Sequence, residues 1–122
     1  MTDPTAIIDT YFAMWNETDP KKRAALIERA WTPDGRYQDP QLDAAGAAAL
    51  AEMVTAVHAQ FPGQRFRRTS GIDRHHDQIR FSWDLATPDG AVTVAGLDVG
   101  ELAPDGRLSR ITGFFGDLPA RS

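Results

Sequence analysis

The chain contains no cysteine, and this absence excludes several kinds of site at once. Without thiols there are no disulfide bonds, no thiolate nucleophiles and no cysteine-ligated zinc. Positive charge is also scarce, because 13 lysines and arginines stand against 17 acidic residues and leave a formal net charge of −4. This balance disfavours general binding to phosphate backbones. The sequence therefore predicts no nucleic-acid partner.

Long apolar runs are missing as well. No segment approaches the length of a membrane span, and residues 1–4 have neither the basic start nor the apolar run of a secretory signal. We therefore expect a cytoplasmic protein without a membrane partner. With 122 residues, of which 42% are hydrophobic and 25% charged, the chain is expected to form one globular domain over residues 1–122.

Three segments have the apolar spacing of helices. In the first, from about residue 5 to 17, apolar side chains recur every three or four residues. They are Ile8, Tyr11, Phe12 and Trp15. The second runs from about residue 21 to 31, with Asp19 as its N-cap and Pro20 at the first helical position. The third runs from about residue 45 to 60 and is rich in alanine, which favours helix.

The other segments are predicted to be strands separated by turns. A turn at 32–35 precedes a short strand at 36–39, which Pro40 ends. Further strands are expected at about 64–73, 78–87, 91–102 and 107–115. The strand at 78–87 alternates clearly, with Ile79, Phe81, Trp83 and Leu85 on one face.

This order of elements predicts an α+β fold. Three helices come first, and an antiparallel meander of strands follows. We expect the helices to cover one face of a strongly curved, mostly antiparallel sheet, so that a cone-shaped cavity remains between them.

Asp98 interrupts a strand that otherwise reads as buried. Alternation places its side chain on the same face as Val92, Val94 and Leu102. A carboxylate in an apolar interior costs roughly several kcal/mol unless it is protonated or finds partners. Asp98 is therefore a candidate functional residue. The alternative is a bulge at one of the neighbouring glycines that turns Asp98 outward.

Two further residues combine with Asp98. Tyr11 lies on the apolar face of the first helix, where it is either a packed tyrosine or a phenol that donates to an oxyanion in the cavity. Asp39 ends the short strand before Pro40, which offers no backbone donor. It is either a turn residue or a general base at the cavity mouth, made more basic by a shortage of hydrogen-bond donors.

The motifs together resemble a known superfamily. Two predicted helices are followed by Trp-Thr-Pro-Asp-Gly at 31–35 and Tyr-Gln-Asp-Pro at 37–40, and then by a third helix and four strands. This order resembles that of the nuclear transport factor 2-like superfamily. That superfamily includes the SnoaL-type polyketide cyclases and the ketosteroid isomerases. The resemblance extends from about residue 6 to 117, and it implies the cone-shaped α+β barrel fold.

The ketosteroid isomerases supply the functional comparison. The resemblance implies that Asp39 removes a proton next to a carbonyl, while Tyr11 and a neutral Asp98 hold the oxygen of the dienolate. Gly-Phe-Phe-Gly-Asp at 113–117 also resembles the end of their last strand. This chemistry needs no metal and no organic cofactor. One feature departs from the pattern, because those enzymes support the catalytic tyrosine with further tyrosines and this chain has two in all.

The cavity is expected to be lined by side chains of the first and third helices and of the strands. The predicted lining residues are Trp15, Met53, Val54, His58, Phe81, Trp83 and Phe114. His58 is either a second acid/base group, as a dehydratase would need, or a partly buried structural histidine.

Two charged clusters have structural explanations. Asp73, His75 and Asp77 would share a face if extended, as metal ligands do, but a solvated hairpin turn is expected and no metal is predicted. Arginines make one region of the sheet basic, and we expect a solvated or subunit-facing surface there. They are Arg65, Arg67, Arg68, Arg74 and Arg80.

The sequence thus predicts a cofactor-independent acid/base enzyme that acts on a small apolar carbonyl compound, by isomerisation or by a related cyclisation or dehydration. The alternative is a non-catalytic module of the same fold that binds a hydrophobic ligand or dimerises. The resemblance also implies a homodimer through the open face of the sheet.

Overall fold

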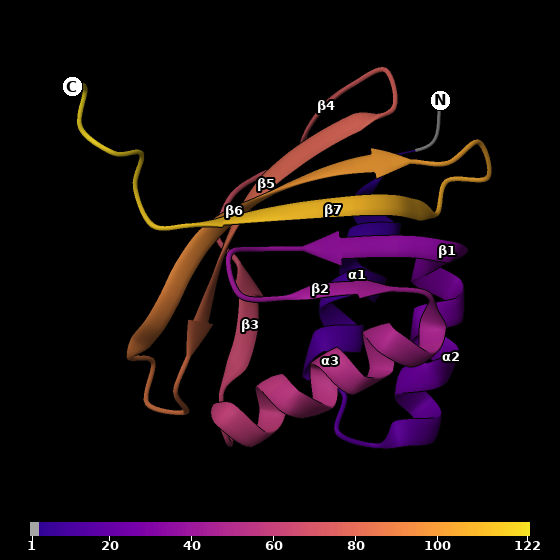
Figure 1. The fold of residues 1–122 in the computed structure, drawn as a ribbon, viewed down its shortest axis with the longest axis horizontal. Helices are drawn as coiled ribbons and strands as arrows, with labels where there is room; N and C mark the ends of the chain where they lie inside the picture. The colour runs from indigo at the N-terminus through magenta and orange to yellow at the C-terminus, as the bar shows by residue number, and fades with distance from the viewer. Residues whose placement is uncertain (1–2) are drawn as a thin grey trace.

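The computed structural model describes residues 3–122, which form three helices and a seven-stranded sheet (Figure 1). The elements are α1 (Thr5–Asn16), α2 (Pro20–Ala30), β1 (Trp31–Gln38), β2 (Asp43–Ala45), α3 (Ala47–Gln60), β3 (Arg65–Arg68), β4 (Asp73–His75), β5 (Gln78–Ala86), β6 (Val92–Leu102) and β7 (Leu108–Phe115).

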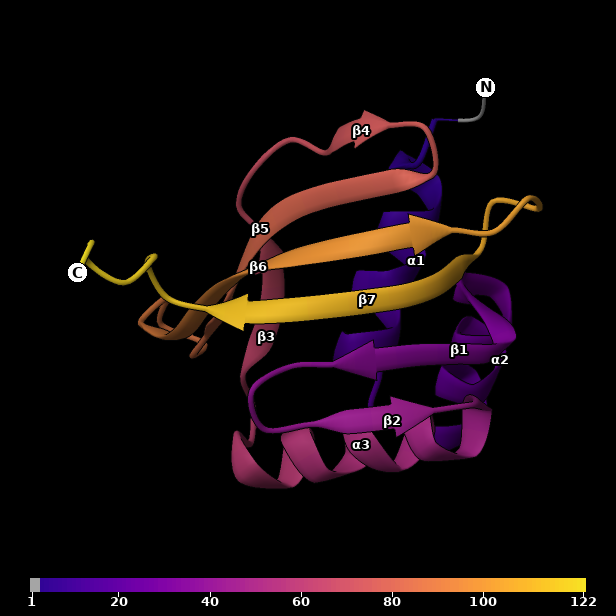
Figure 2. The same ribbon diagram turned by 45° about the horizontal axis from the view of Figure 1, so that its top comes forward.

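The strands make one curved, open sheet in the order β2-β1-β7-β6-β5-β3, with β4 also paired to β5. All three helices lie on the same side of it (Figures 1 and 2). The predicted α+β fold, with helices on one face of a curved and mostly antiparallel sheet, is confirmed. One pairing differs from a simple meander, because β1 runs parallel to β7.

Helix boundaries agree with the predictions to within two residues. The Asp19 side chain accepts hydrogen bonds from the backbone nitrogens of Lys21 and Lys22 at 2.9 and 3.4 Å, which is the predicted N-cap of α2. Pro20 follows at the first helical position, where its missing N–H is not needed.

The predicted turn at 32–35 is wrong, because these residues belong to β1. Pairing of β1 with β7 begins at Trp31 and shifts register before Arg36, so the strand carries an irregularity where turn-forming residues stand. A Cβ atom at Gly35 would lie 2.6 Å from the Trp31 ring, so glycine lets the chain pass close to that side chain. The turn-forming residues at 32–35 therefore lie at an irregularity within a strand and not in a turn between two elements.

The predicted strand at 64–73 is divided into β3 and β4, which both pair with β5. β4 also extends into the predicted turn, so that the tight turn lies at His76 and Asp77, with a φ of 53° at His76. Two of the arginines in this region make ion pairs, Arg67 with Asp84 and Arg80 with Asp73. These contacts show how part of the basic cluster is neutralised.

The core lies between the helices and the concave face of the sheet. The predicted inward face of β5 is confirmed, since Ile79, Phe81, Trp83 and Leu85 are each 5% exposed or less. α1 covers this face with Ile8, Tyr11 and Trp15. None of the helices within residues 3–122 is long and apolar enough to cross a membrane.

Candidate active site

Asp98 points into the core, as alternation along β6 predicted. The pairing of β6 with β5 is regular from Gln78–Glu101 to Leu85–Val94, so neither neighbouring glycine forms a bulge there. Asp98 is only 3% exposed. The alternative of an outward carboxylate is thus excluded. Val92, expected on the same face, is 54% exposed because it lies at the strand end beyond a register shift.

Two buried donors meet the Asp98 carboxyl group. The Tyr11 hydroxyl donates to Oδ2 at 2.7 Å, and the Trp83 indole Nε1–H donates to Oδ1 at 2.9 Å. These side chains come from α1 and β5, so the helix layer and the sheet both hold the carboxyl group. Both of its oxygens are therefore partnered by neutral groups, and no cation neutralises them in these contacts.

Burial is the largest cause of the pKa shifts of Asp98 and Tyr11. Desolvation raises the pKa of Asp98 to about 7, although the hydrogen bonds from Tyr11 and Trp83 lower it, and the charge of Asp39 raises it further. Desolvation, followed by the Asp98 charge, also raises the pKa of Tyr11 well above its ordinary value. Near neutral pH Asp98 therefore exchanges between its neutral and charged forms, while Tyr11 keeps its proton.

Asp39 follows β1 and forms a second hydrogen-bonded group. Its Oδ2 accepts from the Tyr37 hydroxyl at 2.7 Å, and its Oδ1 accepts from the backbone nitrogens of Gln41 and Leu42, both at 2.8 Å. The expectation that Asp39 is poor in donors was wrong. Pro40 lacks an N–H, but the chain turns there and directs the next two amides back to the carboxylate.

Register brings the two groups together at Gly113. Gln38 of β1 pairs with Thr112 of β7, which places the next residues, Asp39 and Gly113, side by side; Gly113 in turn pairs with Asp98 of β6. A Cβ atom at Gly113 would lie 2.9 Å from Asp98 Oδ1, 3.2 Å from the Tyr37 hydroxyl and 3.3 Å from Asp39 Cβ. Both carboxyl groups thus lie next to Gly113, and each accepts a hydrogen bond from one tyrosine.

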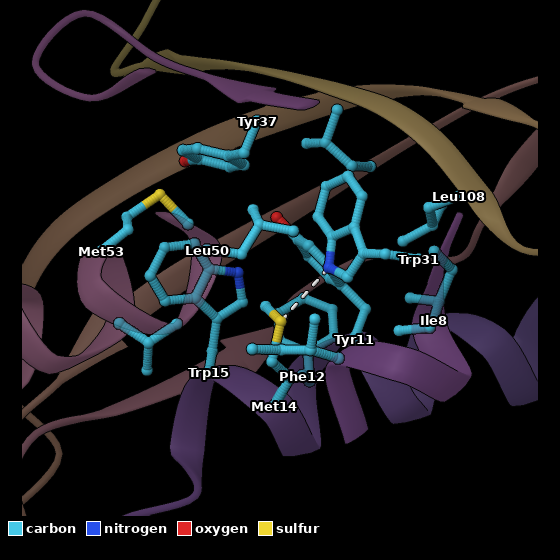
Figure 3. Packing of buried hydrophobic residues seen from close by; sticks show 14 of the residues in the cluster. Ile8, Tyr11, Phe12, Met14, Trp15, Trp31, Tyr37, Leu50, Met53 and Leu108 are labelled. Carbon is cyan, nitrogen blue, oxygen red and sulfur yellow. Dashed lines mark hydrogen bonds between the residues drawn. The ribbon is translucent and has the colours of Figure 1, made fainter. Parts of the chain in front are cut away.

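A pocket of about 160 Å³ opens beside Asp39 and Tyr37. A second space of about 10 Å³ lies deeper, beside Tyr11 and Asp98, and Trp15, Tyr37, Phe66 and Trp83 border both spaces. The rings of Tyr37 and Trp15 lie edge to face, 5.3 Å apart, on this side of the core (Figure 3). The inner space has about the size of one water molecule or one ligand oxygen.

Two of the predicted lining residues, Trp15 and Trp83, line this pocket. Three others, Met53, Val54 and Phe81, are not among its lining residues and pack in the hydrophobic core. They lie on the predicted faces, but they pack against other side chains of the hydrophobic core, of which Figure 3 labels Met53.

The prediction that Phe114 lines the cavity is wrong, because its side chain lies on the outer face of the sheet. Its side chain is 56% exposed and borders a hollow on the outer side of the sheet, together with the 93% exposed Leu118. Gly113 and Phe115 take the inward positions of β7, because they continue the alternation from the fully buried Ile111.

His58 has a structural role in this structure. Its Nε2 lies 2.6 Å from the backbone oxygen of Trp15, which can only accept, so Nε2 carries the proton. Its Nδ1 then accepts from the Arg23 guanidinium at 3.5 Å. Arg23 is 4% exposed and also donates to the Glu17 carbonyl and to Thr55. His58 therefore joins the three helices and does not line the pocket, which argues against an acid/base role.

The polar cluster at the β4–β5 hairpin lies away from this pocket. Asp73 is ion-paired with Arg80, and the rings of His75 and His76 lie against each other with centroids 5.4 Å apart. Across residues 3–122 no three His, Asp or Glu side chains are grouped as ligands of a metal ion.

Tyr37 is the site residue that sequence reasoning missed. The pattern contained a signal for it, because Tyr37 stands two positions before Asp39 on a strand and therefore points to the same face. Desolvation, together with the charges of Asp98 and Asp39, raises its pKa far above the ordinary value, so its hydroxyl remains a hydrogen-bond donor.

Comparison with known families agrees with this fold. The model of the SnoaL-like domain matches residues 8–111, and the chain belongs to this family. A candidate isomerase of the SnoaL-like family from Agrobacterium tumefaciens is 38% identical, with a TM-score of 0.89 over 96% of this chain and 100% of that one. No curated protein matches the chain in sequence.

More distant structures share the fold alone. A candidate polyketide cyclase from Sinorhizobium meliloti is 15% identical, with a TM-score of 0.69 over 92% of this chain and 99% of that one. A candidate SnoaL-like polyketide cyclase from Jannaschia sp. CCS1 is also 15% identical, with a TM-score of 0.67 over 94% and 90% of the two chains.

Proposed function

We propose that this protein is a cofactor-independent enzyme that transfers a proton within a small apolar carbonyl compound, in the manner of a ketosteroid isomerase or a polyketide cyclase. The observation that carries the proposal is that Asp39 and Asp98, with its partner Tyr11, lie close together at Gly113 and border two neighbouring spaces with shared aromatic walls. The two carboxyl groups have different surroundings, and such a difference is what separates a base from an acid in one site.

Asp39 is the proposed base. Three donors hold its carboxylate, and an ionised carboxylate has about four acceptor positions, so one remains for a substrate proton. The two backbone amides fix the plane of the group against the pocket. Asp39 would take a proton from the carbon next to the substrate carbonyl and return it to another carbon.

Tyr11 and Asp98 are the proposed partners of the oxygen that becomes negative. When Asp98 is neutral, it can supply the proton of the 2.7 Å bond to Tyr11. The Tyr11 hydrogen is then free to donate to a ligand oxygen in the inner space. Asp98 in this arrangement acts through Tyr11, while its own Oδ1 still accepts from Trp83.

The experiment follows conversion of 3-cyclohexenone to its conjugated isomer by ultraviolet absorbance, in the wild type and in two matched variants. Val94→Phe fills the pocket, whereas Val92→Phe makes the same change two residues away at an exposed position. We expect the wild type and Val92→Phe to accelerate the reaction and Val94→Phe to lose at least about 90% of that activity. Absence of acceleration with this ketone and with larger unsaturated ketones would contradict the enzyme and favour a binding module.

We also propose that the outer face of the sheet joins two copies of the chain. Phe114 and Leu118 are exposed there beside a hollow in that face. Sedimentation of the wild type is expected to give the mass of a dimer, and Phe114→Glu is expected to give a monomer because it buries a charge at the contact. A monomeric wild type would refute this assembly without bearing on the pocket.

A further inference from the structure

The pocket that contains Asp39 is small and largely aromatic. Its volume of about 160 Å³ is below the roughly 300–1,000 Å³ usual for small-molecule sites. Its aromatic lining consists of Trp15, Tyr37, Phe61, Phe66, Trp83 and Phe115. An apolar cavity of about 150 Å³ accommodates one benzene molecule. The space available therefore suits a single ring, and a fused ring system would extend beyond it.

Tyr11 and Asp98 lie at the inner end of the site, apart from Asp39. The inner space of about 10 Å³ lies beside Tyr11 and Asp98, behind aromatic side chains that also border the outer pocket, and it has room for one oxygen atom. Asp39 lines the outer part, where the ring would lie. A ligand can therefore satisfy the site only with its oxygen directed inward and its ring among the aromatic side chains.

Gly113 leaves room for the polar side chains that would recognise the oxygen. A methyl group at this position would come 2.9 Å from Asp98 Oδ1 and 3.2 Å from the Tyr37 hydroxyl, so it would crowd the polar end of the site. Gly113 does not itself line the aromatic part of the pocket. Its replacement by alanine therefore distinguishes recognition of the oxygen from recognition of the ring.

We infer that the substrate is a carbonyl compound with a single six-membered ring, or an acyclic compound no larger, which enters oxygen first. This inference rests on the proposed function, since it names the substrate class of the same site. It excludes compounds with two or more fused rings as the preferred substrates.

The binding test uses phenols as stable mimics of the planar enolate, with tryptophan fluorescence as the signal because Trp15 and Trp83 line the pocket. The probes are phenol, 2-naphthol and a four-ring phenol. Larger aromatic surfaces ordinarily bind more tightly, so a reversed order indicates a size limit. We expect the wild type to bind phenol at least about tenfold more tightly than 2-naphthol, and Phe61→Ala, which enlarges the pocket, to reduce that preference.

Gly113→Ala tests whether the ligand oxygen is recognised at the polar end of the site. Its control is Gly71→Ala, whose added Cβ would meet no atom within 4 Å. Gly113→Ala should weaken phenol binding by about tenfold or more and leave toluene binding nearly unchanged, whereas Gly71→Ala should alter neither. Tighter binding of 2-naphthol or of the four-ring phenol to the wild type, or binding of no phenol at all, would overturn the inference.

Measurements of kcat/KM with ketones of different size show whether this inference or the proposed function has failed. If two-ring or four-ring unsaturated ketones are isomerised with a higher kcat/KM than 3-cyclohexenone, the size limit is wrong and the enzyme proposal stands. If phenol is preferred but no ketone of any size is isomerised, the size limit stands and the enzyme proposal fails.

Discussion

Replacing Asp98 by asparagine is expected to stabilise the protein at pH 8, raising its free energy of unfolding by up to about 4 kcal/mol. Burial raises the pKa of Asp98 from 3.8 to about 7, so the folded protein binds a proton there more readily than the unfolded chain. The stabilising contribution is complete below about pH 4, is lost as the pH rises through 7, and changes no further above that value.

Asparagine at this position has the shape of the neutral acid and does not titrate. Its oxygen can accept from Trp83, and its NH₂ group can donate to the Tyr11 hydroxyl, which rotates to accept. The wild type and Asp98→Asn should therefore be about equally stable near pH 4 and diverge between pH 4 and 7. Urea unfolding at a series of pH values measures this difference directly.

Asp84→Asn is the matched control. Asp84 is also buried and lies on the neighbouring strand β5, but it is paired with Arg67 through two hydrogen bonds. Its replacement should give no gain in stability at pH 8 and a loss of roughly 0–1 kcal/mol, because Arg67 is half exposed and loses its partner. Parallel stability curves for the wild type and Asp98→Asn would mean that folding does not shift the pKa of Asp98.

Asp39→Asn is expected to lower kcat for 3-cyclohexenone by roughly 10²- to 10⁴-fold, which is the usual contribution of a general base. Asparagine keeps an oxygen for the backbone amides of Gln41 and Leu42, and its NH₂ group can donate to the Tyr37 hydroxyl. The geometry of the pocket should therefore survive, and phenol should still bind with an affinity close to that of the wild type.

Asp34→Asn serves as the control for this loss, because Asp34 is an exposed aspartate on the same strand as Tyr37. It should leave kcat unchanged. A value of kcat for Asp39→Asn within about threefold of the wild type would show that another group removes the proton.

Sequence patterns predicted best where one face of an element is fully buried. The alternation of β5 and the inward side chain of Asp98 follow from period-two patterning, which a buried face enforces strictly. Phe114 was misassigned because two phenylalanines stand next to each other on β7. Counting by two from Ile111 would have chosen Phe115, which lines the pocket.

The parts that could not be predicted depend on contacts between distant segments. The irregular pairing of β1 depends on β7, and local turn residues at 32–35 gave no sign of that pairing. The donors to Asp39 arise from the path of the chain after Pro40. Whether Met53, Val54 and Phe81 line a cavity or fill the core depends on how neighbouring side chains occupy the space, which no pattern in one sequence records.

The parallel pairing of β1 with β7 also determines when the site appears during synthesis. Asp39 is translated early, but it lies beside Gly113 and near Asp98 only after the last strand of the sheet has joined β1. Pairings between such distant segments form late and slowly, because a long loop must close before the contact is made. A nascent chain that lacks β7 can hold folded helices, yet its two carboxyl groups remain apart. The candidate site is therefore complete only with the final step of folding.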